Sequence, residues 1–225
     1  MRTLFFTLKP SITRLYLFKS DEGAVLLDTG IHLSAESIIN FFNEAGVPFS
    51  DLKLIVVSHA HPDHYSGTSL IKKLSSAPVL SHKLALETLQ TGKIHKIFPR
   101  IDCGKRFQES INPHHLPAHE SFTPEILIDG EFDLRPYGIE GKLIPTPGHS
   151  ACNLTLLLDS GEAFVNDMVT TSPYTKKNEL ALLVDDEKKL VESVRMLLSK
   201  AHTFYASHGG PYSKAEVIRL LEEVI

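Results

Sequence analysis

The sequence predicts a single domain of the α+β class. Short segments typical of β-strands follow one another near the N-terminus, a helix comes next, and strands and helices then return without strict βαβ alternation. The chain of 225 residues shows no internal repeat and no change of composition, and it is long enough to bury a substantial core without disulfides. We therefore expect one domain over residues 1–225.

The first quarter of the chain predicts strands followed by a helix. Within Thr13–Lys19, leucines alternate with the aromatic residues Tyr16 and Phe18, as in a strand. A turn joins this segment to a partner strand at Ala24–Leu27. Ser34 supplies a helix N-cap, apolar residues then recur at helical spacing, and Gly46 ends the pattern. The run Leu54–Val57 is wholly apolar, which indicates a strand buried on both faces.

The rest of the chain is less regular. Helical patterns occupy Thr68–Leu74 and Lys83–Leu89. Residues 92–124 contain four prolines and four histidines without periodicity, and we expect a loop-rich insertion near the functional site. Later strands are expected at Phe132–Pro136, Lys142–Pro145, Leu154–Leu158, Ala163–Val165 and Phe204–Ala206, and helices at Asp186–Lys200 and from the capping box Ser213–Glu216 onward.

Composition argues against several classes of protein. Apolar residues make up 42% and charged residues 22%, the formal charge is −4, and no basic track for nucleic acid appears. Cys103 and Cys152 form neither a disulfide framework nor a C-x-x-C pair. The apolar start of the chain breaks at Lys9, so we interpret it as a strand rather than a signal peptide, and no segment approaches the ~20 apolar residues of a membrane span. We expect a cytoplasmic protein with a small-molecule substrate and no nucleic-acid or membrane partner.

The most distinctive segment is the motif H-x-H-x-D-H that begins at His59, directly after an apolar strand. Residues two apart in extended chain point to the same side, and Pro62 disfavours helical geometry at the residue before it. His59 and His61 should therefore converge on one point. Proline also suits the first position of a helix, so Asp63 and His64 should turn toward a second, neighbouring point.

Three further candidate ligands each follow an expected strand. His149 comes after the turn Thr146-Pro147-Gly148, and Asp167 and His208 come directly after later strands. A carboxylate has two oxygens, so Asp167 can bridge two cations. With the first motif these residues make five histidines and two carboxylates: His59, His61, Asp63, His64, His149, Asp167 and His208.

This set of ligands predicts a metal-dependent hydrolase. Imidazole and carboxylate suit zinc, and also iron or manganese. Zinc lowers the pKa of its bound water from about 15.7 to about 7, which gives hydroxide at neutral pH. We expect two divalent ions, with Zn²⁺ as the first choice and Fe or Mn as alternatives, a bridging water as the nucleophile, and Asp63 and Asp167 as catalytic carboxylates.

The order of these motifs resembles the metallo-β-lactamase superfamily, including the segment L-D-T-G that contains Asp28. The resemblance covers nearly the whole chain. It implies a four-layer αββα sandwich with the site at one edge of the two sheets, and it implies that Asp28 orders the motif loop from outside the ligand set. It assigns His59, His61 and His149 to one metal, and Asp63, His64 and His208 to the other, with Asp167 bridging.

Within the superfamily, the sequence is most similar to compact members of the glyoxalase II and lactonase type. Only one helix is expected after His208, the segment between Asp167 and His208 is too short for the extra domain of the nucleic-acid-processing branch, and no export signal appears. Asn166 and Ser207 stand where the superfamily commonly has glycine, and Asn tolerates left-handed backbone. The resemblance thus implies an enzyme that cleaves a small thioester, lactone or related ester.

Several alternatives stay open at this point. A mono-iron enzyme that oxidises a small thiol derivative, as persulfide dioxygenases do, has the same spacing, and a non-catalytic zinc scaffold or a nuclease or phosphodiesterase is less favoured. Tyr174 is a candidate hydrogen-bond donor to the substrate, or a plain surface tyrosine. His114, His115 and His119 suggest a third metal site, although solvated loop histidines explain them more simply. A homodimer is compatible with the sequence.

Overall fold

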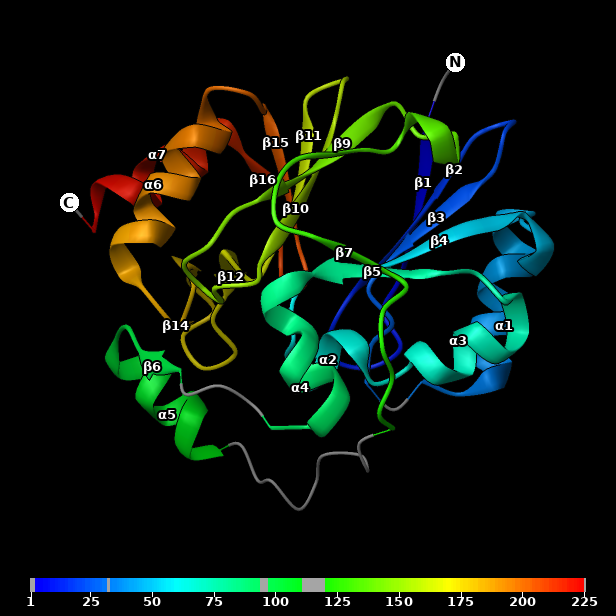
Figure 1. Cartoon of the computed structure of the whole chain (residues 1–225). Helices are drawn as coiled ribbons and strands as arrows, with labels where there is room; N and C mark the ends of the chain where they lie inside the picture. The colour runs from blue at the N-terminus through cyan, green and yellow to red at the C-terminus, as the bar shows by residue number, and fades with distance from the viewer. Residues whose placement is uncertain (1–2, 32, 94–96, 111–119, 225) are drawn as a thin grey trace.

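The structure is a computed structural model that describes residues 3–31, 33–93, 97–110 and 120–224. Two six-stranded sheets pack face to face, with helices on both outer faces, so the predicted four-layer αββα sandwich is confirmed (Figure 1). Among the described residues, no helix combines the length and the apolar character that crossing a membrane requires.

The first sheet has the order β1-β2-β3-β4-β5-β7, antiparallel up to β3 and parallel from there on. Helix α1 (Ala35–Ala45) covers its outer face; as predicted, Ser34 caps it and Gly46 ends it in left-handed conformation at φ 61°. Helices α3 (Thr68–Ser75) and α4 (Leu86–Thr91) follow later. The strands are β1 (Leu4–Leu8), β2 (Leu15–Lys19), β3 (Ala24–Leu27), β4 (Leu52–Val57), β5 (Val79–His82) and β7 (Ile126–Ile128).

The second sheet has the order β16-β15-β11-β10-β9-β8. Helices α6 (Glu187–Leu198) and α7 (Lys214–Glu222) cover its outer face, and the predicted capping box of Ser213 and Glu216 opens α7. The strands are β8 (Phe132–Asp133), β9 (Gly141–Pro145), β10 (Leu154–Leu158), β11 (Glu162–Asn166), β15 (Thr203–Ala206) and β16 (Tyr212–Ser213).

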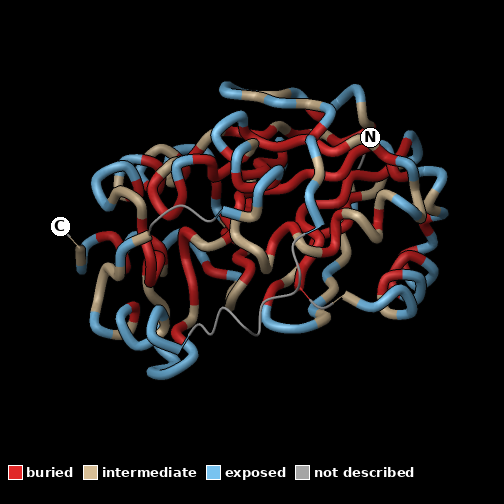
Figure 2. Tube along the Cα trace, turned by 60° about the horizontal axis from the view of Figure 1, so that its bottom comes forward, coloured by how far each residue is buried: buried red, intermediate tan, exposed pale blue. Residues whose placement is uncertain are grey.

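Aromatic side chains fill the space between the two sheets. Phe164 of the second sheet meets Phe18 of the first edge to face, with ring centroids 4.6 Å apart, and Tyr16 lies against it at 4.8 Å. Such pairs stabilise a core beyond the apolar area that they bury. Buried residues accordingly run through the centre of the molecule, and exposed ones lie around its rim (Figure 2).

One sequence-based expectation needs correction, and one region contains elements that were not predicted. The strand expected at Phe132–Pro136 ends at Asp133, because a 3₁₀ turn, η4 (Arg135–Tyr137), follows, and proline has no N–H to donate to a sheet. Within residues 92–124, the described part contains two elements that the sequence did not predict, α5 (Asp102–Ser110) and the short strand β6 (Phe98–Pro99). The four histidines of that region, His95, His114, His115 and His119, lie outside the described residues.

Two short strand pairs complete the description near the site. Strand β6 pairs with β14 (Leu183–Val184), which ties α5 to the segment that precedes α6. Strand β12 (Val169–Thr171) pairs with β13 (Asn178–Leu180) just after Asp167. Helix α2 (Pro62–Tyr65) directly follows His59 and His61, contains Asp63 and His64, and lies below the sheets in Figure 1.

Candidate metal centre

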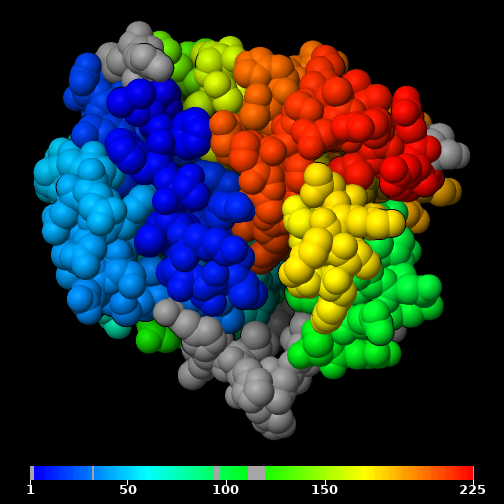
Figure 3. Space-filling model, turned by 180° about the vertical axis from the view of Figure 1, so that it is seen from behind, coloured from blue at the N-terminus to red at the C-terminus, as the bar shows by residue number. Residues whose placement is uncertain are grey.

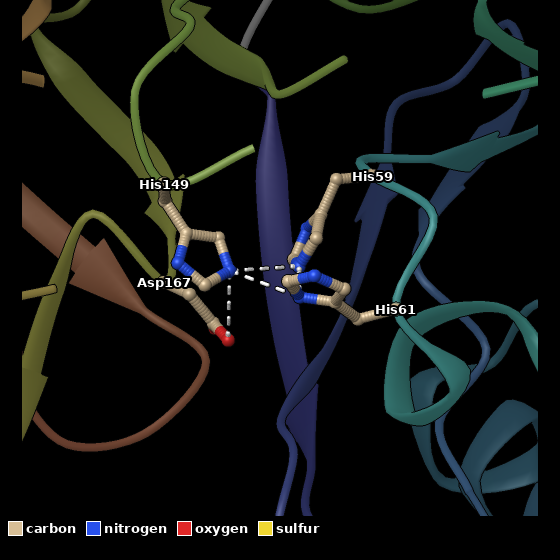
Figure 4. Close-up of side chains that lie close together, drawn as sticks. All are labelled: His59, His61, His149 and Asp167. Carbon is tan, nitrogen blue, oxygen red and sulfur yellow. Dashed lines mark hydrogen bonds and ion pairs between the residues drawn. The ribbon is translucent and has the colours of Figure 1, made fainter. Parts of the chain in front are cut away.

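The seven predicted ligands meet where the loops after β4, β9, β11 and β15 come together. Residues 59–64 come from the first sheet, and the other three come from the second. In Figure 4, His59 and His61 approach from one side, and His149 and Asp167 from the other. Two groups have ligand atoms within 4.8 Å of one another: His59, His61, His149 and Asp167 form one, and Asp63, His64, Asp167 and His208 form the other.

Three imidazole nitrogens face one another in the first group. His61 Nδ1 lies 3.0 Å from His59 Nε2 and 3.0 Å from His149 Nε2, and the last two atoms are 3.3 Å apart. A tetrahedral zinc ion with Zn–N distances of about 2.0–2.1 Å would separate its nitrogen ligands by about 3.4 Å. His61 has the expected extended backbone, at φ −97° and ψ 143°. The three nitrogens are therefore spaced almost as three ligands of one tetrahedral metal ion would be.

The backbone around β14 fixes the orientation of His149. Its Nδ1 donates to the carbonyl of Leu183 at 2.8 Å, which leaves Nε2 directed at the other histidines. Asp185 holds the same turn, because its carboxylate accepts from Ala151 N at 2.7 Å and its N–H donates to Gly148 O at 2.9 Å. Hydrogen bonds of this kind orient histidine ligands at metal sites generally.

The second group places two carboxylates against two histidines. Asp63 Oδ2 lies 3.2 Å from His208 Nε2 and 3.5 Å from His64 Nε2. Asp167 Oδ1 lies 3.4 Å from His64 Nε2, and its Oδ2 lies 3.4 Å from His208 Nε2 and 3.7 Å from His149 Nε2. Asp167 thus reaches both groups, which is the position that a bridging carboxylate requires.

Asp28 supports this group from the buried side. Its Oδ2 lies 2.7 Å from His64 Nδ1 and accepts from Ser58 Oγ at 2.9 Å, and its Oδ1 accepts from Ser58 N at 2.8 Å. Asp28 and Asn166 both adopt left-handed backbone, at φ 63° and 55°, so the tolerance expected of Asn166 is confirmed. Gly67 allows α2 to pack, since a Cβ there would overlap the carbonyl of Thr29.

Burial keeps His59 and His61 neutral. Burial, followed by the neighbouring imidazoles, lowers the pKa of His59 well below its ordinary value and that of His61 to about 3. Metal ligands must be deprotonated, and these histidines therefore offer free lone pairs at neutral pH.

The second group carries charge of both signs. Burial alone would lower the pKa of His208, but Asp167 and Asp63 outweigh it and raise that pKa to about 10. The pKa of His64 rises well above its ordinary value for the same reason. Burial would raise the pKa values of both carboxyl groups, but the same histidines outweigh it and lower them. The two carboxylates therefore favour positive charge between them, and a divalent ion bound there would displace the protons of His64 and His208.

Two buried polar atoms test whether the residues fit a metal. His64 Nε2 and Asp167 Oδ1 are shielded from solvent and lie 3.4 Å apart, but neither atom makes a hydrogen bond. Unpartnered buried polar atoms are costly and need an explanation. A cation between them would satisfy both atoms, and imidazole and carboxylate are suitable ligands for zinc, iron or manganese. The ligand set therefore fits a divalent metal.

Tyr174 makes its contacts with α5. Its side chain is 42% exposed, and its hydroxyl donates to Ser110 Oγ at 2.8 Å and to the carbonyl of Arg106 at 3.3 Å. A role in substrate binding stays a prediction. Sequence reasoning missed several residues with contacts to the ligands, since single common side chains and backbone carbonyls leave no motif. Among them are Thr13, Ser58, Ile12 and Leu183.

Fold and side chains together define a metal-site protein built on an αββα sandwich. The sequence profile of the metallo-beta-lactamase superfamily matches residues 8–208. The chain belongs to this superfamily, as predicted, and its relatives there are metallo-hydrolases.

Similarity to individual proteins is low in sequence and high in fold. The chain is 24% identical over 186 residues to an N-acyl homoserine lactonase of Bacillus thuringiensis, and the match spans 72% of the chain but only 64% of the lactonase. It is 28% identical to the probable metallo-hydrolase YflN of Bacillus subtilis (strain 168), over 83% of the chain and 75% of that protein.

Solved structures show the same fold. A metallo-beta-lactamase family protein from Thermus thermophilus superposes with a TM-score of 0.67 at 22% identity, covering 99% of this chain and 77% of that one. The BLEG-1 B3 metallo-beta-lactamase superposes with a TM-score of 0.69 at 18% identity, covering 97% of both chains.

Proposed function

We propose that the chain is a hydrolase that holds two divalent metal ions, preferably Zn²⁺, and cleaves a small lactone, thioester or related ester. The observation that carries this proposal is the meeting of two ligand groups at Asp167. Its carboxylate lies within 3.7 Å of His149 in the first group and within 3.4 Å of both His64 and His208 in the second. A single metal ion in the first group would not explain why His64 Nε2 of the second group is buried without a hydrogen bond.

The side chains of the site divide the work. Two bound ions would supply an activated water and polarise the carbonyl oxygen under attack. His59 and His61 offer neutral nitrogens from a buried corner, and His149 Nε2 faces them. Asp63 and Asp167 stay ionised at neutral pH, because their pKa values are lowered, so each can accept a hydrogen bond from the attacking water and orient it.

A lactone is the first substrate class to test. The lactonase names among the relatives support it, and esters and thioesters present the same kind of carbonyl to water. A nucleic-acid substrate is disfavoured by the formal charge of −4 and by the lack of a basic track in the sequence.

The experiment combines a substrate screen with three variants of the site. The purified protein, loaded with Zn²⁺, would be assayed against N-acyl homoserine lactones, thioesters, simple esters and phosphodiesters. His61→Ala and Asp167→Ala should abolish turnover with the fold largely kept, and Asp63→Ala should lose the second metal preferentially. Asp21→Ala, in an exposed turn, is the control and should keep full activity.

Two results would overturn the proposal. Turnover retained in Asp167→Ala would contradict the bridging role of that carboxylate. Oxygen uptake with a glutathione persulfide, together with a single bound iron and no hydrolysis, would instead assign the chain to mono-iron oxidation.

A further inference from the structure

The connection between β1 and β2 contains a buried threonine at an unexpected place. Loops normally run over the surface, and the preceding residues follow this rule, since Ser11 is exposed and Ile12 is 54% exposed. Thr13 is only 1% exposed. A buried hydroxyl needs a hydrogen-bond partner, so the partner of this one identifies what the loop does.

The partner of Thr13 is a predicted metal ligand. Its Oγ1 donates to Asp63 Oδ2 at 2.7 Å. The same oxygen lies 3.2 Å from His208 Nε2 and 3.5 Å from His64 Nε2, so it is the atom that Asp63 contributes to the second group. A carboxylate held by one hydrogen bond on this oxygen cannot turn freely away from the histidines.

The residues on either side of Thr13 hold the other sheet. The carbonyl of Ile12 accepts from His208 Nδ1 at 3.0 Å, which directs Nε2 toward Asp63. Arg14 N donates to the carbonyl of Ser207 at 3.1 Å. The Arg14 guanidinium donates to two further carbonyls of the same loop, those of Ala206 and Gly209.

Ile12 and Thr13 thus contact ligands that are far apart in the chain, and Arg14 holds the backbone on either side of His208. Asp63 follows the first sheet and His208 follows the second, 50 and 196 positions from their contacts in this loop. Figure 3 shows the N-terminal segment, in blue, lying directly against the orange segment near the C-terminus. The β1–β2 connection is therefore placed to set the spacing between the two ligands.

We propose that Thr13 is a positioning residue for the second metal site and that the β1–β2 connection holds Asp63 and His208 at the separation that a metal ion needs. The inference rests on the proposed function, because it assumes that the second group binds metal. Groups that orient metal ligands typically contribute 10–100-fold in affinity, and we expect an effect of about that size here.

Zn²⁺ binding to the metal-free protein, measured against a competing chelator, tests this role without relying on turnover. Thr13→Val keeps the shape of the side chain and removes the donor, so the second ion should bind about 10–100-fold more weakly while the first binds as in the wild type. Thr13→Ser keeps the hydroxyl and should restore the second site. Thr13→Ala removes the hydroxyl without adding bulk and provides the same test if the valine variant folds poorly.

Thr88→Val is the matched control. Thr88, on α4, is also fully buried, and its hydroxyl donates at 2.9 Å to the carbonyl of Lys93, which is not a candidate ligand. This variant should bind both ions normally. If the wild type binds two ions and the hydroxyl-free Thr13 variants bind them equally tightly, or if Thr13→Ser is as weak as Thr13→Val, the inference is wrong. If the wild type binds no Zn²⁺, the proposed function itself fails.

Discussion

The backbone of Gly209 packs directly against the hydroxyl of Tyr212, with no space between them for a side chain. A Cβ at Gly209 would overlap this hydroxyl and Thr171 Oγ1, and φ there is +118°, a conformation that other residues rarely adopt. The carbonyl of the preceding residue, His208, accepts from Thr171 N at 2.7 Å and from Thr170 Oγ1 at 3.1 Å. The position of His208 therefore depends on this close approach.

Gly209→Ala should displace His208 and weaken the second metal site more than the first. The backbone strain alone should cost about 1–3 kcal/mol of unfolding free energy. Urea unfolding and Zn²⁺ titration would measure the two effects. Gly130→Ala is the control, because a Cβ at Gly130 meets nothing within 4 Å, and a variant of Gly209 that behaves like it would refute this explanation.

Asp28→Asn should loosen the second site from its buried side. Asparagine keeps the shape and tolerates the left-handed backbone, but it cannot accept all three hydrogen bonds that Ser58 and His64 direct at the carboxylate. A buried donor left without a partner costs about 1–3 kcal/mol. We expect that loss in thermal or urea unfolding, and metal affinity lowered about 10–100-fold.

The control for this variant is Asp129→Asn, which changes an exposed carboxylate paired with Lys83. It should bind metal as the wild type does. Wild-type metal affinity in Asp28→Asn would show that Asp28 shapes the turn only and does not orient His64.

The metal-free protein should lose stability as the pH rises above neutrality. The folded state raises the pKa of His208 from 6.5 to about 10, so its contribution to stability is complete below pH 6.5 and disappears as the pH rises toward 10. His64 acts in the same direction. The lowered pKa values of Asp63 and Asp167 give no slope in this range, because both carboxylates are ionised in both states.

Urea unfolding of the chelator-treated protein at several pH values from 7 to about 9 would measure this slope. His208→Gln should flatten it. Stability that rises with pH over this range would contradict the assignment of protonated histidines to the second group.

Local patterns predicted most of the fold correctly. Period and capping residues placed α1, α6 and α7, because a helix end such as Ser34 or Ser213 is specified by its own neighbours. Helix α5 was missed, since Gly104 is its only fully buried residue and it has no apolar stripe to mark it. The preceding strand β6 pairs with β14, and Arg100 donates to the carbonyl of Ala181, so the partners of this region come from a segment about 80 residues away.

In the candidate site, too, features with a local sequence pattern were predictable and features that depend on tertiary contacts were not. The candidate ligands were predictable because each is a residue of distinctive chemistry in a segment that follows a strand. The residues that hold them were not, apart from Asp28, since Thr13 and the carbonyls of Ile12 and Leu183 matter only through the packing of one sheet on the other. Tertiary contacts of common residue types carry no local signal.

Elemental analysis of the purified protein after incubation with Zn²⁺ and removal of free metal tests the central claim most directly. We predict two ions per chain in the wild type and loss of metal in Asp167→Ala, because that carboxylate lies in both groups. A wild-type protein that retains no divalent metal, or an Asp167→Ala variant that still holds two ions as tightly, would contradict the claim.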